Sequence, residues 1–197
     1  MKTVTVSYNV YQYAELSEEA KETAKQWYLD GQDAGFFQED VQCDLRNFFP
    51  DSDLKVAFQL AYCQGDGFSI YGKIRLVEFL ELVKENFSEK ELKFLKWALS
   101  EYSSVVDIES PWRSPYINYE KVGFVDEIWS DMEYEHLKNI PWNVLEKFDQ
   151  ACAAYMEDLC EQYEKWGYSY FYEVDDETME DMCESNGYWF TEDGRIA

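Results

Sequence analysis

Apolar and polar residues alternate at the start of the chain and then change to a helical spacing. Residues 3–13 place valine or tyrosine at alternate positions, which predicts a strand. Ser17 is preceded by an apolar residue and followed by two acids, as at many helix N-termini, so a helix is expected over 18–30. Apolar residues three or four positions apart predict a second helix over 36–49, which Pro50 ends.

The clearest local pattern is that of a β-hairpin. Residues 54–63 and 68–74 both alternate between apolar and polar, and Gln64-Gly65-Asp66-Gly67 interrupts them with the residue types of a tight turn. Glycines near an aspartate could also suggest a phosphate cradle or a calcium loop, but the further residues of those motifs are missing. The next expected elements are helices over 75–86 and 89–102 and strands over 104–109 and 116–121.

The longest predicted helix is amphipathic and covers 143–166, where apolar residues recur every three or four positions. Around it, a helix-leaning segment is expected over 127–138, a strand over 168–174, a short helix over 175–185 and a terminal strand over 188–191. These elements predict an α+β fold, with an antiparallel sheet built from hairpins, several packed helices and one long C-terminal amphipathic helix. Because no linker divides the chain, we expect a single compact domain over 1–197, with a more acidic lobe from about residue 123.

Charge changes this picture more than any motif. Forty-one acidic residues oppose seventeen basic ones, for a formal net charge of −24, and twenty of the acids lie between residues 123 and 193 with only three lysines. Such acidic chains are often disordered, but aromatic residues make up 18% of this one and supply the surface for a folded core. The excess charge indicates a positively charged partner. Direct nucleic-acid binding is not expected, because the chain would repel a polyanion.

The sequence offers little catalytic chemistry. His136 is the only histidine and lies among acids that favour its protonated form, so it is a poor base for a nucleophile. The five cysteines form no C-x-x-C pair, and paired carboxylates mean little in a chain with 41 acids. We therefore expect a protein that is not an enzyme and has no cofactor and no metal. The N-terminus does not resemble a signal peptide and no apolar run could span a membrane, so a cytoplasmic protein without membrane contact is expected.

Acids are dense enough in places to resemble a nucleic-acid strand. Residues 157–164 carry four acids over about 12 Å of helix, or one per roughly 3 Å, and one DNA strand carries one charge per about 3.4 Å. Averaged over 143–166 the net charge is one per roughly 9 Å, so duplex mimicry would require several acidic elements side by side. In the helix over 175–185, the acids near the C-terminal end oppose the helix dipole, which indicates a role other than helix stability. The predicted partner-binding residues are Asp126, Glu127, Asp131, Glu133, Glu135, Glu157, Asp158, Glu161, Glu164, Asp175, Asp176, Glu177, Glu180, Asp181 and Glu184.

Three segments carry a family resemblance: the helix start at 16–21, the box Tyr62-Cys63-Gln64-Gly65-Asp66-Gly67 with the two residues that follow, and the tail at 186–195. They resemble a family of small, uncharacterised acidic proteins encoded by bacteriophages and prophages. The resemblance implies an origin in a mobile element and assigns no functional residue. In general character the chain is also similar to phage anti-defence proteins such as anti-CRISPRs, several of which are acidic and occupy nucleic-acid channels of their targets.

These observations lead to three hypotheses. The first is a phage-encoded inhibitor that binds a basic groove of a host nucleic-acid-binding protein, such as a CRISPR effector nuclease, and blocks guide RNA or target DNA there, in the manner of a nucleic-acid mimic. The second is a protein–protein interaction module, such as an antitoxin or a phage regulatory protein, which binds through the exposed aromatics Trp112, Tyr116, Trp129 and Trp142. The third is a metal-dependent enzyme.

Overall fold

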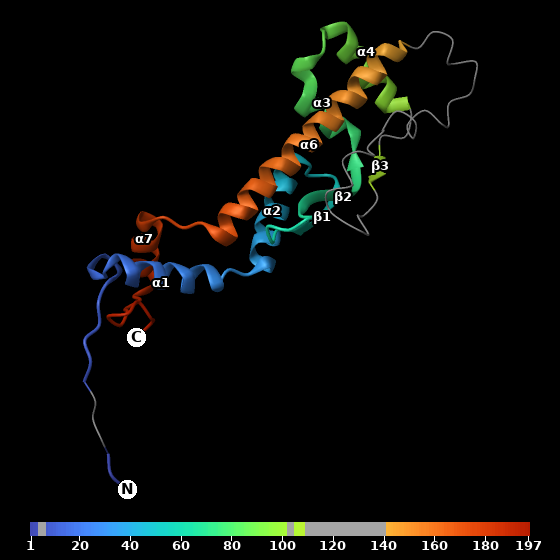
Figure 1. Ribbon diagram of the computed structural model, residues 1–197. Helices are drawn as coiled ribbons and strands as arrows, with labels where there is room; N and C mark the ends of the chain where they lie inside the picture. The colour runs from blue at the N-terminus through green and yellow to red at the C-terminus, as the bar shows by residue number, and fades with distance from the viewer. Residues whose placement is uncertain (4–6, 102–104, 109–140) are drawn as a thin grey trace. The chain divides into compact units, whose positions relative to one another are not determined.

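The fold is α+β, as predicted, with several helices, a three-stranded antiparallel sheet and a long C-terminal helix (Figure 1). A computed structural model describes residues 1–3, 7–101, 105–108 and 141–197. Contacts divide the chain into two compact units, one made of Met1–Ala34 with Gly167–Ala197 (unit 1) and one made of Gly35–Trp166 (unit 2). Whether the two units form the single domain expected from the sequence stays a prediction.

Unit 2 contains the sheet, in the order β1 (Asp53–Gln59), β2 (Gly67–Arg75) and β3 (Val105–Ile108). β1 and β2 form the predicted hairpin, with Val56 opposite Ile70 and Phe58 opposite Phe68, but β1 ends at Gln59 and not at residue 63 as expected. These side chains share one face of the sheet, because residues two apart along a strand point the same way. The strand predicted over 116–121 and the segment 127–138 lie outside the described residues.

The helices of unit 2 begin and end close to the predicted positions. They are α2 (Ala34–Phe48), α3 (Leu76–Val83), α4 (Glu89–Glu101) and the greater part of α6 (Trp142–Tyr172). The single helix expected over 75–86 is shorter, because its last turn is a 3₁₀ helix, η2 (Lys84–Asn86). α4 begins with a capping box, in which the backbone N–H of Ser88 donates to Glu91 and the backbone N–H of Glu91 donates to the Ser88 hydroxyl.

Aromatic side chains connect α2 and α6 to the hairpin. The Phe37 ring lies 5.2 Å from the Phe58 ring in β1 and 5.2 Å from the Trp166 ring in α6. The Phe68 ring of β2 lies 5.4 Å from the Tyr163 ring, so α2 and α6 both pack against the apolar face of the hairpin. These contacts bury one face of α6 and leave the opposite face for charged residues.

The strand expected over 168–174 is wrong, because α6 continues to Tyr172. Its aromatic residues fit a strand by composition, but on the helix Tyr168 and Tyr172 are four positions apart and their rings lie 6.1 Å from each other. Adding a residue to an existing helix also avoids the cost of starting a new element. The backbone N–H of Glu173 closes the last turn on the carbonyl of Ser169 at 3.0 Å.

Unit 1 packs the two ends of the chain together. It contains the 3₁₀ helix η1 (Tyr13–Glu15), α1 (Glu18–Asp30) and α7 (Asp176–Asn186). Ser17 caps α1 as predicted, and its hydroxyl accepts a hydrogen bond from the backbone N–H of Ala20 at 3.3 Å. The core of unit 1 consists of Tyr13, Leu16, Ala20, Ala24, Met179, Cys183 and Phe190.

The two terminal strands are largely absent from the described residues. Residues 7–10 form no regular element, and Tyr8 and Val10 are exposed, so the alternation does not create a buried face. Tyr11 and Phe190 instead form one isolated antiparallel bridge, and Phe190 forms another with Ile196. Single bridges thus replace the strands expected over 3–13 and 188–191, with residues 4–6 outside the description.

Substitution of two glycines in unit 1 tests how closely its segments pack together. We expect Gly194→Ala to destabilise the protein by roughly 3 kcal/mol or more, since the residue has φ +83° and a Cβ there would meet the carbonyl oxygen of Ala20 at 2.0 Å. Gly187→Ala is the matched control, with φ +67° and nothing within 4 Å of its Cβ, and should cost about 1–2 kcal/mol. Urea unfolding of both variants measures the difference, and equal losses would contradict the packing of Gly194 on α1.

Candidate functional site

Four of the predicted partner-binding residues lie on the part of α6 that belongs to unit 2. We call this set the α6 acidic stripe; it consists of Glu157, Asp158, Glu161 and Glu164. Glu157, Glu161 and Glu164 are separated by four and three positions, so they follow one side of the helix. The buried residues of the same segment, Met156, Leu159, Cys160 and Tyr163, make up the apolar face.

The α6 acidic stripe is mostly exposed, and described basic side chains neutralise little of its charge. Glu157, Asp158 and Glu161 are exposed, whereas Glu164 is half-buried. In the described part of the chain, the single ion pair of the stripe joins Glu161 to Lys165 at 3.5 Å. Asp158 accepts a hydrogen bond from the Gln162 side chain at 2.6 Å, which leaves its charge in place.

The hairpin loop adds a further carboxylate next to the stripe. Burial raises the pKa of Glu164, and the negative charges of Asp66 and Glu161 raise it further. Asp66 also organises the loop, because it accepts hydrogen bonds from the backbone N–H groups of Ala61 and Cys63 at 2.7 and 3.0 Å. Gln64-Gly65-Asp66-Gly67 is therefore part of a tight loop, as predicted, and it brings an acid to α6. The sequence analysis had not included Asp66 among the partner-binding residues.

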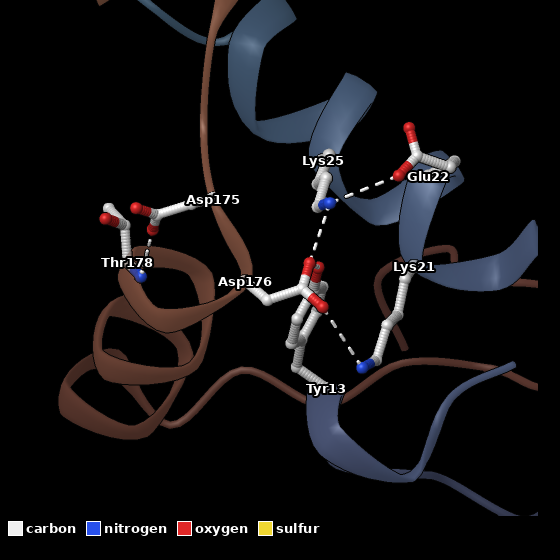
Figure 2. A network of polar contacts seen from close by, with 7 residues as sticks. All are labelled: Tyr13, Lys21, Glu22, Lys25, Asp175, Asp176 and Thr178. Carbon is white, nitrogen blue, oxygen red and sulfur yellow. Dashed lines mark hydrogen bonds and ion pairs between the residues drawn. The ribbon is translucent and has the colours of Figure 1, made fainter. Parts of the chain in front are cut away.

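Two acids of the C-terminal cluster have structural partners within unit 1 (Figure 2). Asp175 is the N-cap of α7 and accepts a hydrogen bond from the backbone N–H of Thr178 at 2.7 Å. Asp176 accepts hydrogen bonds from the Tyr13 hydroxyl at 2.9 Å and from Lys21 at 3.4 Å, and it forms an ion pair with Lys25 at 2.7 Å. These contacts, led by the Lys25 hydrogen bond, lower the pKa of Asp176 to about 2. Asp176 thus joins α1, η1 and α7.

The other acids of α7 have no such partners among the described residues. We call Glu177, Glu180, Asp181 and Glu184 the α7 acidic stripe; their spacings of three, one and three place them on one side of the helix. All four are exposed, and within the described residues none forms an ion pair or a hydrogen bond through its side chain. Met179 and Cys183 occupy the buried side. Glu184 is in the last turn, where the helix dipole disfavours an acid and where α7 has no basic residue.

A groove of about 250 Å³ lies beside the α7 acidic stripe in unit 1. Its lining combines carboxylates with aromatic rings: Gln12, Tyr13, Ala14, Glu180, Cys183, Glu184, Gly187, Tyr188 and Trp189. Sequence reasoning treated Tyr188 and Trp189 as part of a strand and missed this groove. The available signal was a helix-ending Gly187 followed directly by two large aromatics, because a left-handed C-cap turns the next residues back along the helix.

The remaining predicted partner-binding residues, Asp126, Glu127, Asp131, Glu133 and Glu135, lie outside the described residues, as does His136. In the described ranges, no group of three or more histidine, cysteine, aspartate or glutamate side chains is arranged to hold a metal ion. No helix in these ranges combines the length and apolar character needed to cross a membrane.

The Asp176 contacts predict a defined acid dependence. Asp176→Asn should lower the urea midpoint at pH 7, because it removes the charge that Lys21 and Lys25 neutralise. The folded pKa is about 2 against an ordinary value of 3.8, so this contribution is complete above pH 4 and disappears as the pH falls towards 2. The difference between wild type and variant should therefore shrink over that range. Glu177→Gln is the matched control. If it lowers the urea midpoint as much as Asp176→Asn does, a specific role for Asp176 is contradicted.

Comparisons with protein-family models, with curated protein sequences and with solved structures find no match for this chain. The resemblance to phage and prophage proteins therefore stays a prediction. Its three segments have visible structural roles: the first starts α1, the box holds the hairpin loop, and the tail contributes Phe190 to the core of unit 1. Proteins that share these segments would share local structure, and the segments identify no binding partner.

Proposed function

We propose that this protein is a non-enzymatic inhibitor whose acidic surface occupies a basic, nucleic-acid-binding groove of a host protein. The observation that carries the proposal is the α6 acidic stripe, which presents three exposed carboxylates and one ion pair in the described part of the chain. An amphipathic helix places its polar residues on its exposed side, but this side of α6 carries four acids within about 12 Å, a density greater than solubility requires. When a cationic partner binds, its basic groups neutralise these carboxylates, and counterions are released as the two charged surfaces meet.

The surroundings of Glu164 support this proposal. Partial burial, followed by the negative charges of Asp66 and Glu161, raises its pKa, so keeping Glu164 ionised has a cost in the free protein. A cationic partner removes that cost when it binds, which makes the interaction stronger than with isolated acids. Perturbed titration of this kind is frequent at functional sites.

In our proposal, the α6 acidic stripe competes with a nucleic acid for the basic groove by imitating its charge. The stripe matches the charge spacing of one strand over about 12 Å, and Asp66 of the hairpin loop adds a carboxylate from a second element of unit 2. A CRISPR effector nuclease is the proposed class of target, since its guide and target strands lie in a positively charged channel. The phage anti-defence role follows from that target and from the resemblance described above.

Affinity capture tests the proposal and identifies the target. The immobilised protein is exposed to a bacterial lysate at low salt, and a salt step releases bound proteins for mass spectrometry. We expect a nucleic-acid-binding protein whose purified form loses at least about tenfold in affinity between 50 and 200 mM salt. An affinity that hardly changes with salt would instead favour recognition through aromatic side chains, of which Trp142 is 38% exposed.

Charge reversal tests the stripe itself. With the purified target, Glu157→Lys, Asp158→Lys and Glu161→Lys combined should weaken binding by roughly 100-fold or more, because like charges would face each other. The matched control reverses three exposed acids elsewhere in unit 2, namely Glu39, Glu85 and Glu146. Both variants change the net charge equally. If the control weakens binding as much as the stripe variant, net charge acts alone and the stripe is not the binding site.

A further inference from the structure

We infer that the groove beside α7 binds an arginine side chain of the cationic partner, between the carboxylates of Glu180 and Glu184 and the rings of Tyr188 and Trp189. This inference rests on the proposed function, because it assigns a contact to the same class of partner. It adds a second binding element, in unit 1, that recognises one residue type by shape as well as by charge.

The lining of the groove suits a side chain that is apolar along its length and charged at its end. Buried Tyr13 and Cys183 form apolar parts of the lining, while exposed Glu180 and Glu184 contribute negative charge. The volume of about 250 Å³ is below the roughly 300–1,000 Å³ of pockets for drug-sized ligands, so it suits a single side chain. Arginine and lysine have this combination of an aliphatic stem and a cationic head.

The backbone of Tyr188 and Trp189, the two aromatic residues of the inferred binding site, is held in place before a ligand binds. The backbone N–H of Tyr188 donates to the carbonyl of Cys183 at 3.0 Å, which ties the residue to the end of α7. The Trp27 ring packs edge-on against the Tyr188 ring at 5.3 Å. Trp189 is fixed by its neighbour Phe190, which bridges to Tyr11, and by its carbonyl, which accepts a hydrogen bond from Ala197 at 2.9 Å. Little backbone conformational entropy is therefore lost when a ligand binds.

Trp189 remains available for a partner. It is 44% exposed, and it makes no ring contact with another aromatic residue in the described part of the chain. The face of an indole ring attracts cations more strongly than the faces of the other aromatic side chains do. A guanidinium group is preferred over an ammonium group here, because it is planar, stacks on aromatic faces and can donate to two carboxylate oxygens at once.

The two glutamates themselves indicate a missing cation. Glu180 and Glu184 are four positions apart, a spacing at which like charges destabilise a helix, and Glu184 lies in the last turn of α7. No described lysine or arginine pairs with either of them. A bound guanidinium group would neutralise both charges, so the unfavourable placement in the free protein becomes favourable in the complex.

A short peptide provides a probe that does not require the host partner. Acetyl-Gly-Arg-Gly-amide is titrated into the 15N-labelled protein at low salt, and the indole N–H signal of Trp189, identified by its loss in Trp189→Phe, is followed by NMR. We expect a saturable shift with the arginine peptide and almost none with the same peptide containing citrulline, the neutral isostere of arginine. A lysine peptide should bind several-fold more weakly. Equal binding of the arginine and citrulline peptides would overturn the inference.

Variants of α7 distinguish binding in the groove from attraction by the overall negative charge of the protein. Glu180→Gln with Glu184→Gln should weaken the arginine peptide roughly tenfold, whereas Glu177→Gln with Asp181→Gln should weaken it less than about threefold. Both pairs remove two charges four positions apart on the same helix, but only Glu180 and Glu184 line the groove. Equal effects would overturn the inference, because net charge would then explain them. Trp189→Leu, which keeps apolar bulk, should also weaken binding several-fold, followed through the Tyr188 amide signal.

The two proposals can fail separately. If the arginine peptide does not bind while a host partner is still captured through the α6 acidic stripe, the groove assignment is wrong and the proposed function stands. If the peptide binds in the groove while no basic partner is captured, the groove assignment stands and the proposed function is wrong.

Discussion

The structure depends on aromatic packing strong enough to hold a highly charged chain together. With a net charge of −24, exposed carboxylates repel one another, by about 1 kcal/mol for a pair 4 Å apart in water and less with salt. Complete burial of a phenylalanine side chain stabilises the fold by roughly 1.5–3 kcal/mol, and Phe37, Phe68 and Phe79 are all fully buried. Each ring therefore outweighs one or more close charge repulsions. This balance allows α6 to be apolar on one face and acidic on the other.

Some of the acids serve the fold directly, and the contrast with the two stripes is informative. Glu91 accepts hydrogen bonds from Ser88 and pairs with Lys147, contacts that lower its pKa to about 2. Asp44 accepts a hydrogen bond from the buried Tyr163 hydroxyl at 2.8 Å, and Asp176 is the centre of the network in Figure 2. The acids of the α6 and α7 stripes do little of this kind in the described structure. Stability explains the first group, and binding to a cationic partner is the role that we propose for the second.

Elements set by neighbouring residues could be read from the sequence. The Ser17 cap, the short helix α7 and the hairpin of β1 and β2 all depend on residues within a few positions. The extension of α6 to Tyr172 was missed, since a short aromatic run is compatible with a strand or a helix and only its connection to an existing helix decides. The structural role of Asp176 and the groove at Trp189 were also missed. Both require contacts between the two ends of the chain, which no local pattern contains.

Building unit 1 from both termini has a consequence for the synthesis of the protein. The hydrogen bond between Tyr13 and Asp176 joins residues 163 positions apart. At about 5–20 residues per second, α1 waits roughly ten to thirty seconds on the ribosome before α7 is translated. Fragments that end before residue 167 contain none of the C-terminal half of unit 1, and the apolar side of α1 stays uncovered in them. Translation of residues 167–197 thus decides whether unit 1 forms, and products that lack them expose a surface that chaperones and proteases can recognise.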